Sequence, residues 1–302
     1  MTDHNALVDI LFRKPDDIFN LPDAGQHAQA YLHAQPYPHL VVTDFFKPAV
    51  MQLLSRELVA DEVNFDVVFT DDFQKKKTIS TGDAVPPLIS LLAAKFAAPA
   101  MLRYLEKLTG LRRLVPDPYY NTDYGYYHIV GSGGVLGSHV DHSRHSSLNI
   151  PHVLNVVVYL TQDWQEKDGG TLCLFDKTGK EVVARIPSYC NHAAIFACTP
   201  TAYHGVEPVA ADSKRRRHSI YFAYYSVDAV GSAAQSFFPA AQSGASNADS
   251  AVNYGTYFVV PFFSLFRVKN WIHLRTRLVY LANLLLPPIL AVGLKKLIRS
   301  LR

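Results

Sequence analysis

The sequence predicts a mainly β core with flanking helices, and three observations support this fold class. Between residues 119 and 227, short runs rich in Val, Ile, Tyr and Phe alternate with turn clusters, and no helical segment separates them. Apolar residues recur at helical spacing only before this region, over 47–58 and 87–109. Strands that follow one another without intervening helices favour an antiparallel sandwich or barrel. Two early helices would then cover one outer face of that core.

The segment before the core is expected to mix helices with short strands. Residues 1–35 form a polar lead-in of weak helical character. The helix over 47–58 has Pro48 in its first turn, where the missing N–H costs nothing. Pro99 is expected to kink or divide the helix over 87–109, because proline breaks the helical hydrogen-bond ladder. Extended pieces are expected at 37–46 and, around a charged loop, at 64–81.

The core itself is expected to consist of strands separated by turns rich in Gly, Asp and Lys. The candidate strands are YGYYHIV (124–130), LNVVVYL (154–160), TLCLF (171–175), VVARI (182–186), AAIFAC (193–198), HGVEPV (204–209) and HSIYFAYYS (218–226). The candidate turns are GSGG (131–134), KDGG (167–170), DKTGK (176–180) and ADSKR (211–215).

These patterns divide the chain into four parts. Residues 1–118 form a strand and helix layer that supports the core, residues 119–227 form the core, and residues 228–254 are a linker or mobile loop of small polar residues. Residues 255–302 form an apolar and basic helical tail that Pro287 and Pro288 interrupt. Basic flanks around a short apolar segment predict a peripheral membrane contact through 257–302, and helices packed on the core or at a dimer interface are the alternative.

Composition excludes several classes of protein. The 302-residue chain has 49% hydrophobic and 18% charged residues, which is an ordinary globular balance. A net charge of +3 is too small to indicate nucleic-acid binding. Its cysteines, Cys173, Cys190 and Cys198, lack metal-type spacing and are expected to be free thiols. Free thiols and the absence of a signal-like start predict a cytoplasmic protein, peripheral at the inner membrane face if the tail binds lipid.

The triplet His139-Val140-Asp141 carries the first candidate chemistry. Alternate side chains of a strand point the same way, so this imidazole and this carboxylate can reach one metal ion. A third ligand is expected from His204, which opens a later candidate strand. Two imidazoles and one carboxylate on one face of an octahedron leave open positions, an arrangement typical of non-haem Fe(II) oxygenases.

Arg217 adds a second signal at the head of the last candidate strand. Alternation places Arg217, Ser219 and Tyr221 on one face and His218 on the other. A buried guanidinium needs an anion, because an unpaired buried charge is costly. The neighbouring Arg215 and Arg216 are interpreted as a solvated basic turn.

Residues 124–226 resemble the 2-oxoglutarate/Fe(II)-dependent dioxygenase superfamily in its prolyl-hydroxylase-like branch, with bacterial members of glycan and natural-product pathways. The resemblance covers about a third of the chain. It rests on GSHVDHS (137–143), LNVVVYLTQDW (154–164), DGGTLCLF (168–175), TAYHGVEPV (201–209) and RHSIYFAYYS (217–226). It implies a double-stranded β-helix, or jelly roll, in agreement with the strand pattern.

The resemblance also implies roles for individual residues. His139, Asp141 and His204 would be the catalytic iron ligands, and Arg217 with Ser219 would bind the distal carboxylate of 2-oxoglutarate. Tyr159 would offer its phenol to the same carboxylate, and its alternation partner Asn155 would face the cavity. Where some prolyl hydroxylases have a cosubstrate-binding tyrosine this chain has Ile129, so Tyr127 is the expected substitute; core positions are the alternative for Tyr127, Asn155 and Tyr159.

The implied reaction uses Fe(II), 2-oxoglutarate and O2 and releases succinate and CO2, with hydroxylation as the default outcome. The expected substrate is a small molecule, a sugar or a lipid-linked glycan precursor. A peptidyl, prolyl-type hydroxylase is one alternative, and a cupin-like metal-binding or isomerase protein is another, although such a protein has no need for Arg217. The loop over 143–152, with His145 and His152, would cover the iron and contact substrate, or would be polar surface. The sequence leaves homo-oligomer formation open.

Overall fold

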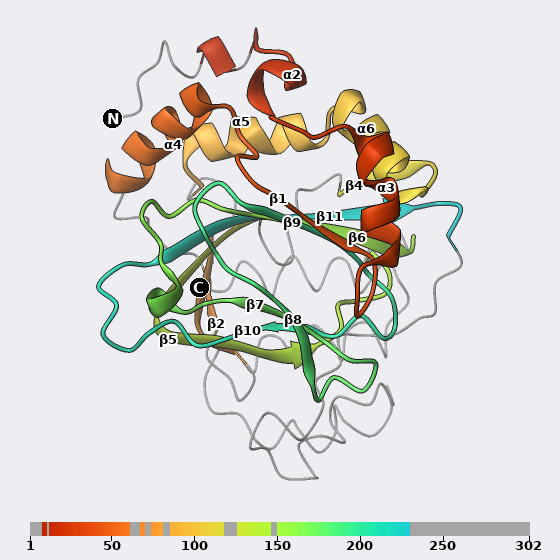
Figure 1. Cartoon of the computed structure of the whole chain (residues 1–302). Helices are drawn as coiled ribbons and strands as arrows, with labels where there is room; N and C mark the ends of the chain where they lie inside the picture. The colour runs from red at the N-terminus through yellow and green to blue at the C-terminus, as the bar shows by residue number, and fades with distance from the viewer. Residues whose placement is uncertain are drawn as a thin grey trace, which may run out of the picture. The chain divides into compact units, whose positions relative to one another are not determined.

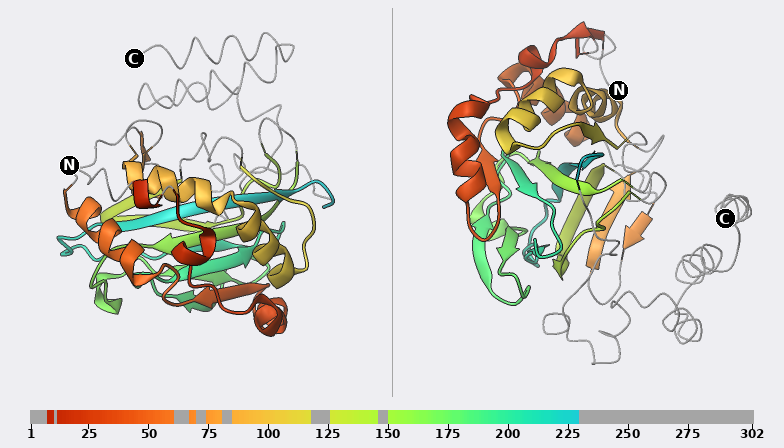
Figure 2. Two further views of the ribbon diagram at one scale, coloured as in Figure 1. Left: turned by 90° about the horizontal axis from the view of Figure 1, so that it is seen from above. Right: turned by 90° about the vertical axis from the view of Figure 1, so that its right-hand side faces the viewer.

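The computed structural model describes residues 8–10, 12–60, 67–69, 74–80, 85–117, 126–145 and 150–229. Five labelled helices lie together on one side of a large β-sheet (Figure 1). They are α2 (Pro15–Ile18), α3 (Ala24–His33), α4 (Pro48–Ala60), α5 (Pro87–Phe96) and α6 (Pro99–Thr109). The left view of Figure 2, from above, shows the helices lying over the strands, and the right view shows the helix layer above them.

The described strands all pair antiparallel and belong to one sheet. They are β1 (His39–Val42), β2 (Val67–Phe69), β3 (Gln74–Ser80), β4 (Leu114–Pro116), β5 (Tyr127–His139), β6 (His152–Tyr159), β7 (Leu172–Phe175), β8 (Val182–Ile186), β9 (Ala193–Ala197), β10 (His204–Val206) and β11 (Arg217–Ser226). Their main order is β1-β9-β6-β11-β5-β10-β7-β8, with β4 beside β11 and β2-β3 beside β5. The sheet curls into two layers that form a nearly closed barrel, which confirms the predicted jelly-roll core (Figure 1).

Strand β5 connects the two layers. Its first residues, Tyr127–Val130, pair with β11 under the helices, and its last residues pair with β10 in the opposite layer. The register against β3 shifts between these halves, and Gly133 has a φ of 70°. The prediction of a turn at GSGG (131–134) was therefore wrong, because the glycines form a bulge within one long strand.

The helices α5 and α6 begin at prolines, as the sequence predicts. Pro87 and Pro99 stand in the first turns of α5 and α6, so the predicted division at Pro99 is confirmed, and the two helices are bent by 55°. No single helix among the described residues is long and apolar enough to cross a membrane. Only the bent pair α5–α6 reaches that length and composition, and its apolar residues are core residues such as Leu92 and Leu105.

The main core lies between the helices and the outer face of β5, β6, β9 and β11. The Phe96 side chain of α5 is fully buried, and its ring stacks on Phe222 of β11 at 4.5 Å between ring centroids. Phe19 and Phe45, from before β1 and just after it, contact the same Phe96 ring at 5.2 and 5.8 Å. This aromatic cluster holds the helix layer on the sheet and so fixes one wall of the barrel.

The expected linker at 228–254 lies almost entirely outside the described residues, and the expected tail at 255–302 lies wholly outside them. Both therefore stay predictions, as does the membrane contact through 257–302. The part before residue 118, expected to support the core, contributes β1 to β4 to the same sheet.

The Phe96→Ala substitution is expected to reduce the free energy of unfolding by about 3 to 5 kcal/mol, because it removes a fully buried ring and leaves a cavity. Denaturant unfolding followed by circular dichroism measures this loss. The control is Phe12→Ala at a ring that is 79% exposed, which is expected to change stability by less than about 0.5 kcal/mol. Equal losses in the two variants would contradict the proposed role of the aromatic cluster.

Candidate active site

Two histidines meet across neighbouring strands. His139 ends β5 and His204 begins β10, and the two are direct partners in the antiparallel pairing. Their ring centroids are 4.3 Å apart. Gly205 permits this close approach, because a Cβ atom at that position would lie 2.9 Å from the carbonyl oxygen of Leu136 on β5. The pairing register therefore brings the two imidazoles together.

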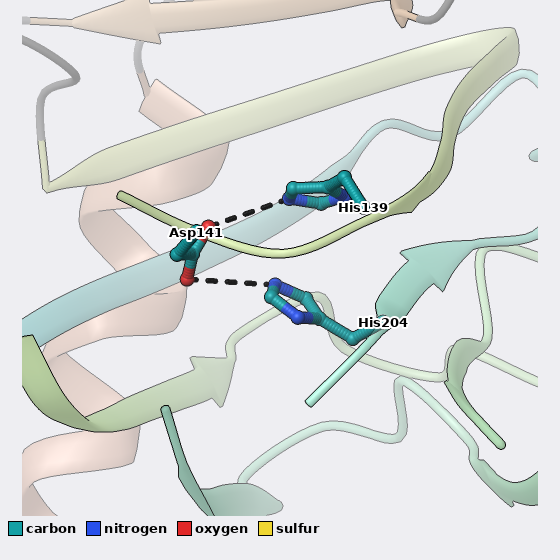
Figure 3. Close-up of side chains that lie close together, drawn as sticks. All are labelled: His139, Asp141 and His204. Carbon is teal, nitrogen blue, oxygen red and sulfur yellow. Dashed lines mark ion pairs between the residues drawn. The ribbon is translucent and has the colours of Figure 1, made fainter. Parts of the chain in front are cut away.

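Asp141 completes a cluster with these histidines (Figure 3). Its Oδ1 lies 3.4 Å from Nε2 of His139, and its Oδ2 lies 3.6 Å from Nε2 of His204. One ligand atom from each of the three residues lies within 4.8 Å of the others. Two imidazole nitrogens and a carboxylate oxygen at this spacing could hold a metal ion, and this donor set suits Fe(II).

Both imidazoles have a fixed orientation. Nδ1 of His139 lies 2.9 Å from the backbone oxygen of Gly137, and Nδ1 of His204 lies 3.2 Å from that of Ala202. A backbone oxygen only accepts, so each Nδ1 donates, and Nε2 is the nitrogen of each ring that faces Asp141. Burial lowers the pKa of His204 to about 4 although Asp141 opposes this shift, so the ring is neutral at pH 7 and able to bind a metal.

The carboxylate of Asp141 is ionised within this cluster. Burial alone would raise its pKa, but His204, His139 and His152 together hold the pKa well below its usual value. Asn155 of β6 donates from Nδ2 to Oδ2 of Asp141 at 2.6 Å. The hydroxyl of Tyr221 on β11 lies 3.5 Å from the same oxygen.

A second buried polar centre surrounds Arg217. Its Nη1 donates to the backbone oxygen of Gly170 at 2.6 Å and contacts the Ser188 hydroxyl at 3.4 Å. The guanidinium carbon lies 5.5 Å from the centre of the Tyr159 ring. The Nε of Arg217 is buried and has no hydrogen-bond partner within the described residues.

No carboxylate of the described residues pairs with Arg217. Burial lowers the pKa of the guanidinium, although arginine stays charged at neutral pH. A buried unpaired charge and an unsatisfied N–H group are both costly. The pocket therefore has the charge and the free donor that an anionic group would use.

The two polar centres lie along one interior face. Arg217 and Tyr221 are four residues apart on β11, and Tyr159 and Asn155 are four residues apart on the adjacent β6. Four residues of strand span about 13 Å. At one end of this face, Arg217 lies beside Tyr159. At the other end, Tyr221 and Asn155 both contact Asp141. An anion bound at Arg217 would therefore lie on the same interior face as Asp141.

The structure brings most of the predicted site residues together. His139, Asp141 and His204 form the cluster, and Asn155 bonds to Asp141. Ser219 is buried on the face of Arg217, opposite Tyr159 of β6. The alternation predicted for Arg217, Ser219 and Tyr221 agrees with the structure, since Phe222 packs on the helices instead.

Tyr127 is not brought to this face. Its hydroxyl lies 2.6 Å from Nδ1 of His218, and its ring belongs to the core under the helices, together with Ile129. The pairing of β5 with β11 places His128 opposite Ser219 instead. The suggestion that Tyr127 replaces a cosubstrate-binding tyrosine is therefore corrected, because the bulge in β5 reverses the alternation between His139 and this end of the strand.

Two further expectations need correction. Arg215 is not simply solvated: its Nη2 pairs with Asp168 at 2.7 Å and its guanidinium lies 6.0 Å from the Trp164 ring. Arg216 is exposed, as expected. In the loop over 143–152, His145 and His152 are buried rather than part of a polar surface, and residues 146–149 lie outside the described part of the chain.

Sequence reasoning missed several residues of the site. Gly170 and Ser188 form the end of the Arg217 pocket, and no sequence signal links Ser188 to Arg217 before the chain folds. The ring of His128 stacks on Tyr221 at 5.4 Å between centroids. The alternation of β11 could have predicted Tyr221 as a site residue, because Tyr221 lies on the same face as Arg217.

Comparison with known proteins gives a family match for part of the chain. Residues 124–225 match the family model described as the 2OG-Fe(II) oxygenase superfamily. This range contains the whole cluster, Arg217 and Tyr221. No curated protein sequence matches the chain.

Similar folds occur among solved structures, all at low sequence identity. A prolyl-4-hydroxylase from Pseudomonas putida is 16% identical, with 68% of this chain and 100% of that chain covered and a TM-score of 0.45. A Trichoplax adhaerens prolyl hydroxylase, in complex with a peptide fragment of the hypoxia inducible factor oxygen degradation domain, is 15% identical (67% and 88% covered, TM-score 0.47). HygX from Streptomyces hygroscopicus, with nickel, 2-oxoglutarate and hygromycin B bound, is 14% identical (63% and 83% covered, TM-score 0.42).

The family match covers about a third of the 302 residues and coincides with the strands that carry the candidate site. The donor set of the cluster suits the iron of this family, and the buried cationic pocket suits the carboxylate of its cosubstrate. Residues 124–225 therefore match the 2OG-Fe(II) oxygenase superfamily over the strands that carry the candidate site.

Proposed function

We propose that the chain is a 2-oxoglutarate-dependent dioxygenase and that His139, Asp141 and His204 are its iron ligands. Their convergence within 4.8 Å, together with the outward-fixed Nδ1 atoms of the two imidazoles, supports this assignment. Three protein ligands leave coordination positions for the cosubstrate and O2.

We further propose that Arg217 binds the distal carboxylate of 2-oxoglutarate. The observation that carries this proposal is its buried guanidinium, which lacks a carboxylate partner among the described residues and has a free Nε. The hydroxyls of Ser219 and Ser188 and the phenol of Tyr159 line the same pocket and would complete the recognition. Burial raises the pKa of Tyr159, so its phenol stays a neutral donor.

The residues of the chain orient the reactants and exclude water, while the metal supplies the redox chemistry. The chemistry of the bound iron is activation of O2 coupled to decarboxylation of 2-oxoglutarate to succinate and CO2. Arg217 would anchor one end of the cosubstrate so that its 2-oxo acid end reaches the cluster. Buried apolar side chains such as Leu174 and Phe196 keep the interior beside the cluster dry.

The substrate we propose is a small molecule, a sugar or a lipid-linked precursor, and the outcome is hydroxylation. A peptidyl, prolyl-type hydroxylase is the alternative. Succinate release that depends on the candidate substrate tests this assignment. Release with proline-containing peptides, and not with small molecules, would show a peptidyl hydroxylase instead.

The first prediction concerns the metal. Wild-type protein mixed anaerobically with Fe(II) and 2-oxoglutarate is expected to show the visible charge-transfer absorption of a chelated 2-oxo acid. Asp141→Ala is expected to lose this absorption, because one of the three protein ligands is gone. Asp212→Ala, in an exposed turn, is the control and is expected to keep it. Absence of the band from the wild type would refute the proposed function.

The second prediction separates affinity from stability at Arg217. Arg217→Met is expected to weaken 2-oxoglutarate binding by at least about 30-fold, because truncating one partner of a buried charge pair costs about 2 to 5 kcal/mol. The same variant without ligand is expected to unfold at an equal or higher denaturant concentration, since it removes an unpaired buried charge. Arg216→Met at the exposed neighbour is expected to change neither property. Unchanged binding in Arg217→Met would contradict the anchor.

The third prediction concerns Gly170, which has a φ of 67°. A Cβ atom there would lie 3.0 Å from Cδ of Arg217, so Gly170→Ala is expected to raise the KM for 2-oxoglutarate several-fold. Gly110→Ala is the matched control, because Gly110 has a φ of 74° but no atom near its Cβ position. Both variants are expected to lose about 1 to 3 kcal/mol of stability through backbone strain. An equal rise of the KM in both would show that strain alone is responsible.

A further inference from the structure

A chain of buried hydrogen bonds reaches Asp141 from the side of β6. Asn155, which is fully buried, donates from Nδ2 to Oδ2 of Asp141 at 2.6 Å. On its other side, Oδ1 of Asn155 lies 2.8 Å from Nε2 of His152, the first residue of β6. Asn155 therefore stands between the imidazole of His152 and the carboxylate of Asp141.

The chemistry of these groups fixes the direction of each hydrogen bond. An ionised carboxylate only accepts, so the amide of Asn155 must turn its nitrogen to Asp141 and its oxygen to His152. That orientation is favourable only if Nε2 of His152 carries a proton. Nδ1 of His152 lies 3.0 Å from the backbone oxygen of His142, which is also an acceptor. Each ring nitrogen of His152 therefore faces an oxygen acceptor.

The surroundings of His152 hold its ring in place. The side chain is 7% exposed, and its ring lies 5.1 Å from that of Tyr225 between centroids. The sulfur of Cys198 lies 3.5 Å from Nε2. Burial raises the pKa of the Cys198 thiol well above its usual value, so this side is a neutral wall. A rigid donor is thus directed at Asn155.

We propose that His152 and Asn155 form a positioning relay for Asp141, in which His152 fixes the amide of Asn155 and the amide fixes the rotation of the carboxylate for metal binding. The relay rests on the proposed metal site. Neither residue belongs to the proposed ligand set, so His152 would act through Asn155 and Asn155 through Asp141. Partners of this kind typically change metal affinity about 10- to 100-fold when they are removed.

Asp141, His152 and Cys198 also offer ligand atoms within 4.8 Å of one another, which makes a separate metal site the competing interpretation. The observations favour the relay. The Nε2 atom of His152 already bonds to Asn155, so a separate metal site would have to break this hydrogen bond.

The experiment is an anaerobic calorimetric titration of the full chain with Co(II), which needs no turnover. Asn155→Ala is expected to weaken Co(II) binding about 10- to 100-fold. His152→Leu is expected to weaken it as well, and the double variant is expected to be no weaker than Asn155→Ala alone, because His152 acts only through Asn155. His152→Gln keeps an N–H donor and is expected to restore part of the affinity. Val157→Ala, on the same face of β6, is the control and is expected to bind normally.

Cooperative thermal unfolding of each variant without metal is the control that the variant is folded. If Asn155→Ala does not fold, the comparison of His152→Leu with His152→Gln still tests the relay. Affinity of Asn155→Ala within twofold of the wild type would overturn the relay, as would multiplicative losses in the double variant. Loss of binding in Cys198→Ser with retention in His139→Ala would establish the competing site and overturn the relay. If the wild type bound no Co(II), or if His139→Ala bound it normally, both the proposed metal site and the relay would be refuted. If only the relay is wrong, Co(II) binding still depends on His139 but not on Asn155 or His152.

Discussion

The fold and the site both depend on one strand that pairs with two layers of the sheet. β5 begins beside β11 under the helices and ends beside β10 in the opposite layer, with a bulge near Gly133 between the two halves. This crossing joins the two layers into one continuous sheet. It also places His139, at the end of β5, directly across from His204, at the start of β10. A bulge increases local twist and bends a strand, which a straight ladder cannot do. The geometry that closes the barrel is thus the geometry that assembles the imidazole pair.

The buried charged residues of the described structure differ in whether they have an oppositely charged partner. Asp168 is paired with Arg215 at 2.7 Å, and Asp117 lies 3.5 Å from His145. Arg217, equally buried, finds only a backbone oxygen and a hydroxyl among the described residues. Because an uncompensated buried charge lowers stability, a chain that keeps one is expected to use it. This contrast distinguishes a 2-oxoglutarate oxygenase from a jelly roll that only binds a metal. The cluster around Asp141 would suit either kind of protein, but the cationic pocket of Arg217 suits only a protein that binds an anion.

Sequence alternation grouped residues on the faces of single strands, but it did not show which face of β5 meets the interior of the barrel. On β11 it correctly grouped Arg217, Ser219 and Tyr221, because that strand pairs with β6 in one register up to Tyr224. On β5, Tyr127 and Ile129 do share one face, but that face belongs to the core under the helices. Two residue steps of β3, from Lys75 to Lys77, stand opposite five steps of β5, from Val135 to Val130, and this shift reverses the alternation relative to His139. Asn155 was expected to lie on the same face as Tyr159. Its contact with Asp141, like that of Ser188 with Arg217, joins segments from different strands or loops, and no local pattern contains such a pairing.

The three residues of the cluster are oriented by bonds of different range. Each histidine donates from Nδ1 to the backbone oxygen two residues before it, so its ring orientation comes with its own strand. A carboxylate cannot be held in that way, because it has no donor of its own to offer a backbone oxygen. Asp141 depends on Asn155, which belongs to β6, and the amide of Asn155 depends in turn on His152. The imidazoles can therefore be oriented as soon as β5 and β10 pair, whereas the carboxylate is oriented only after β6 has docked beside β11. The proposed metal site would then require both layers of the barrel, so we expect the stability of the β6–β11 pairing to influence its affinity for a metal.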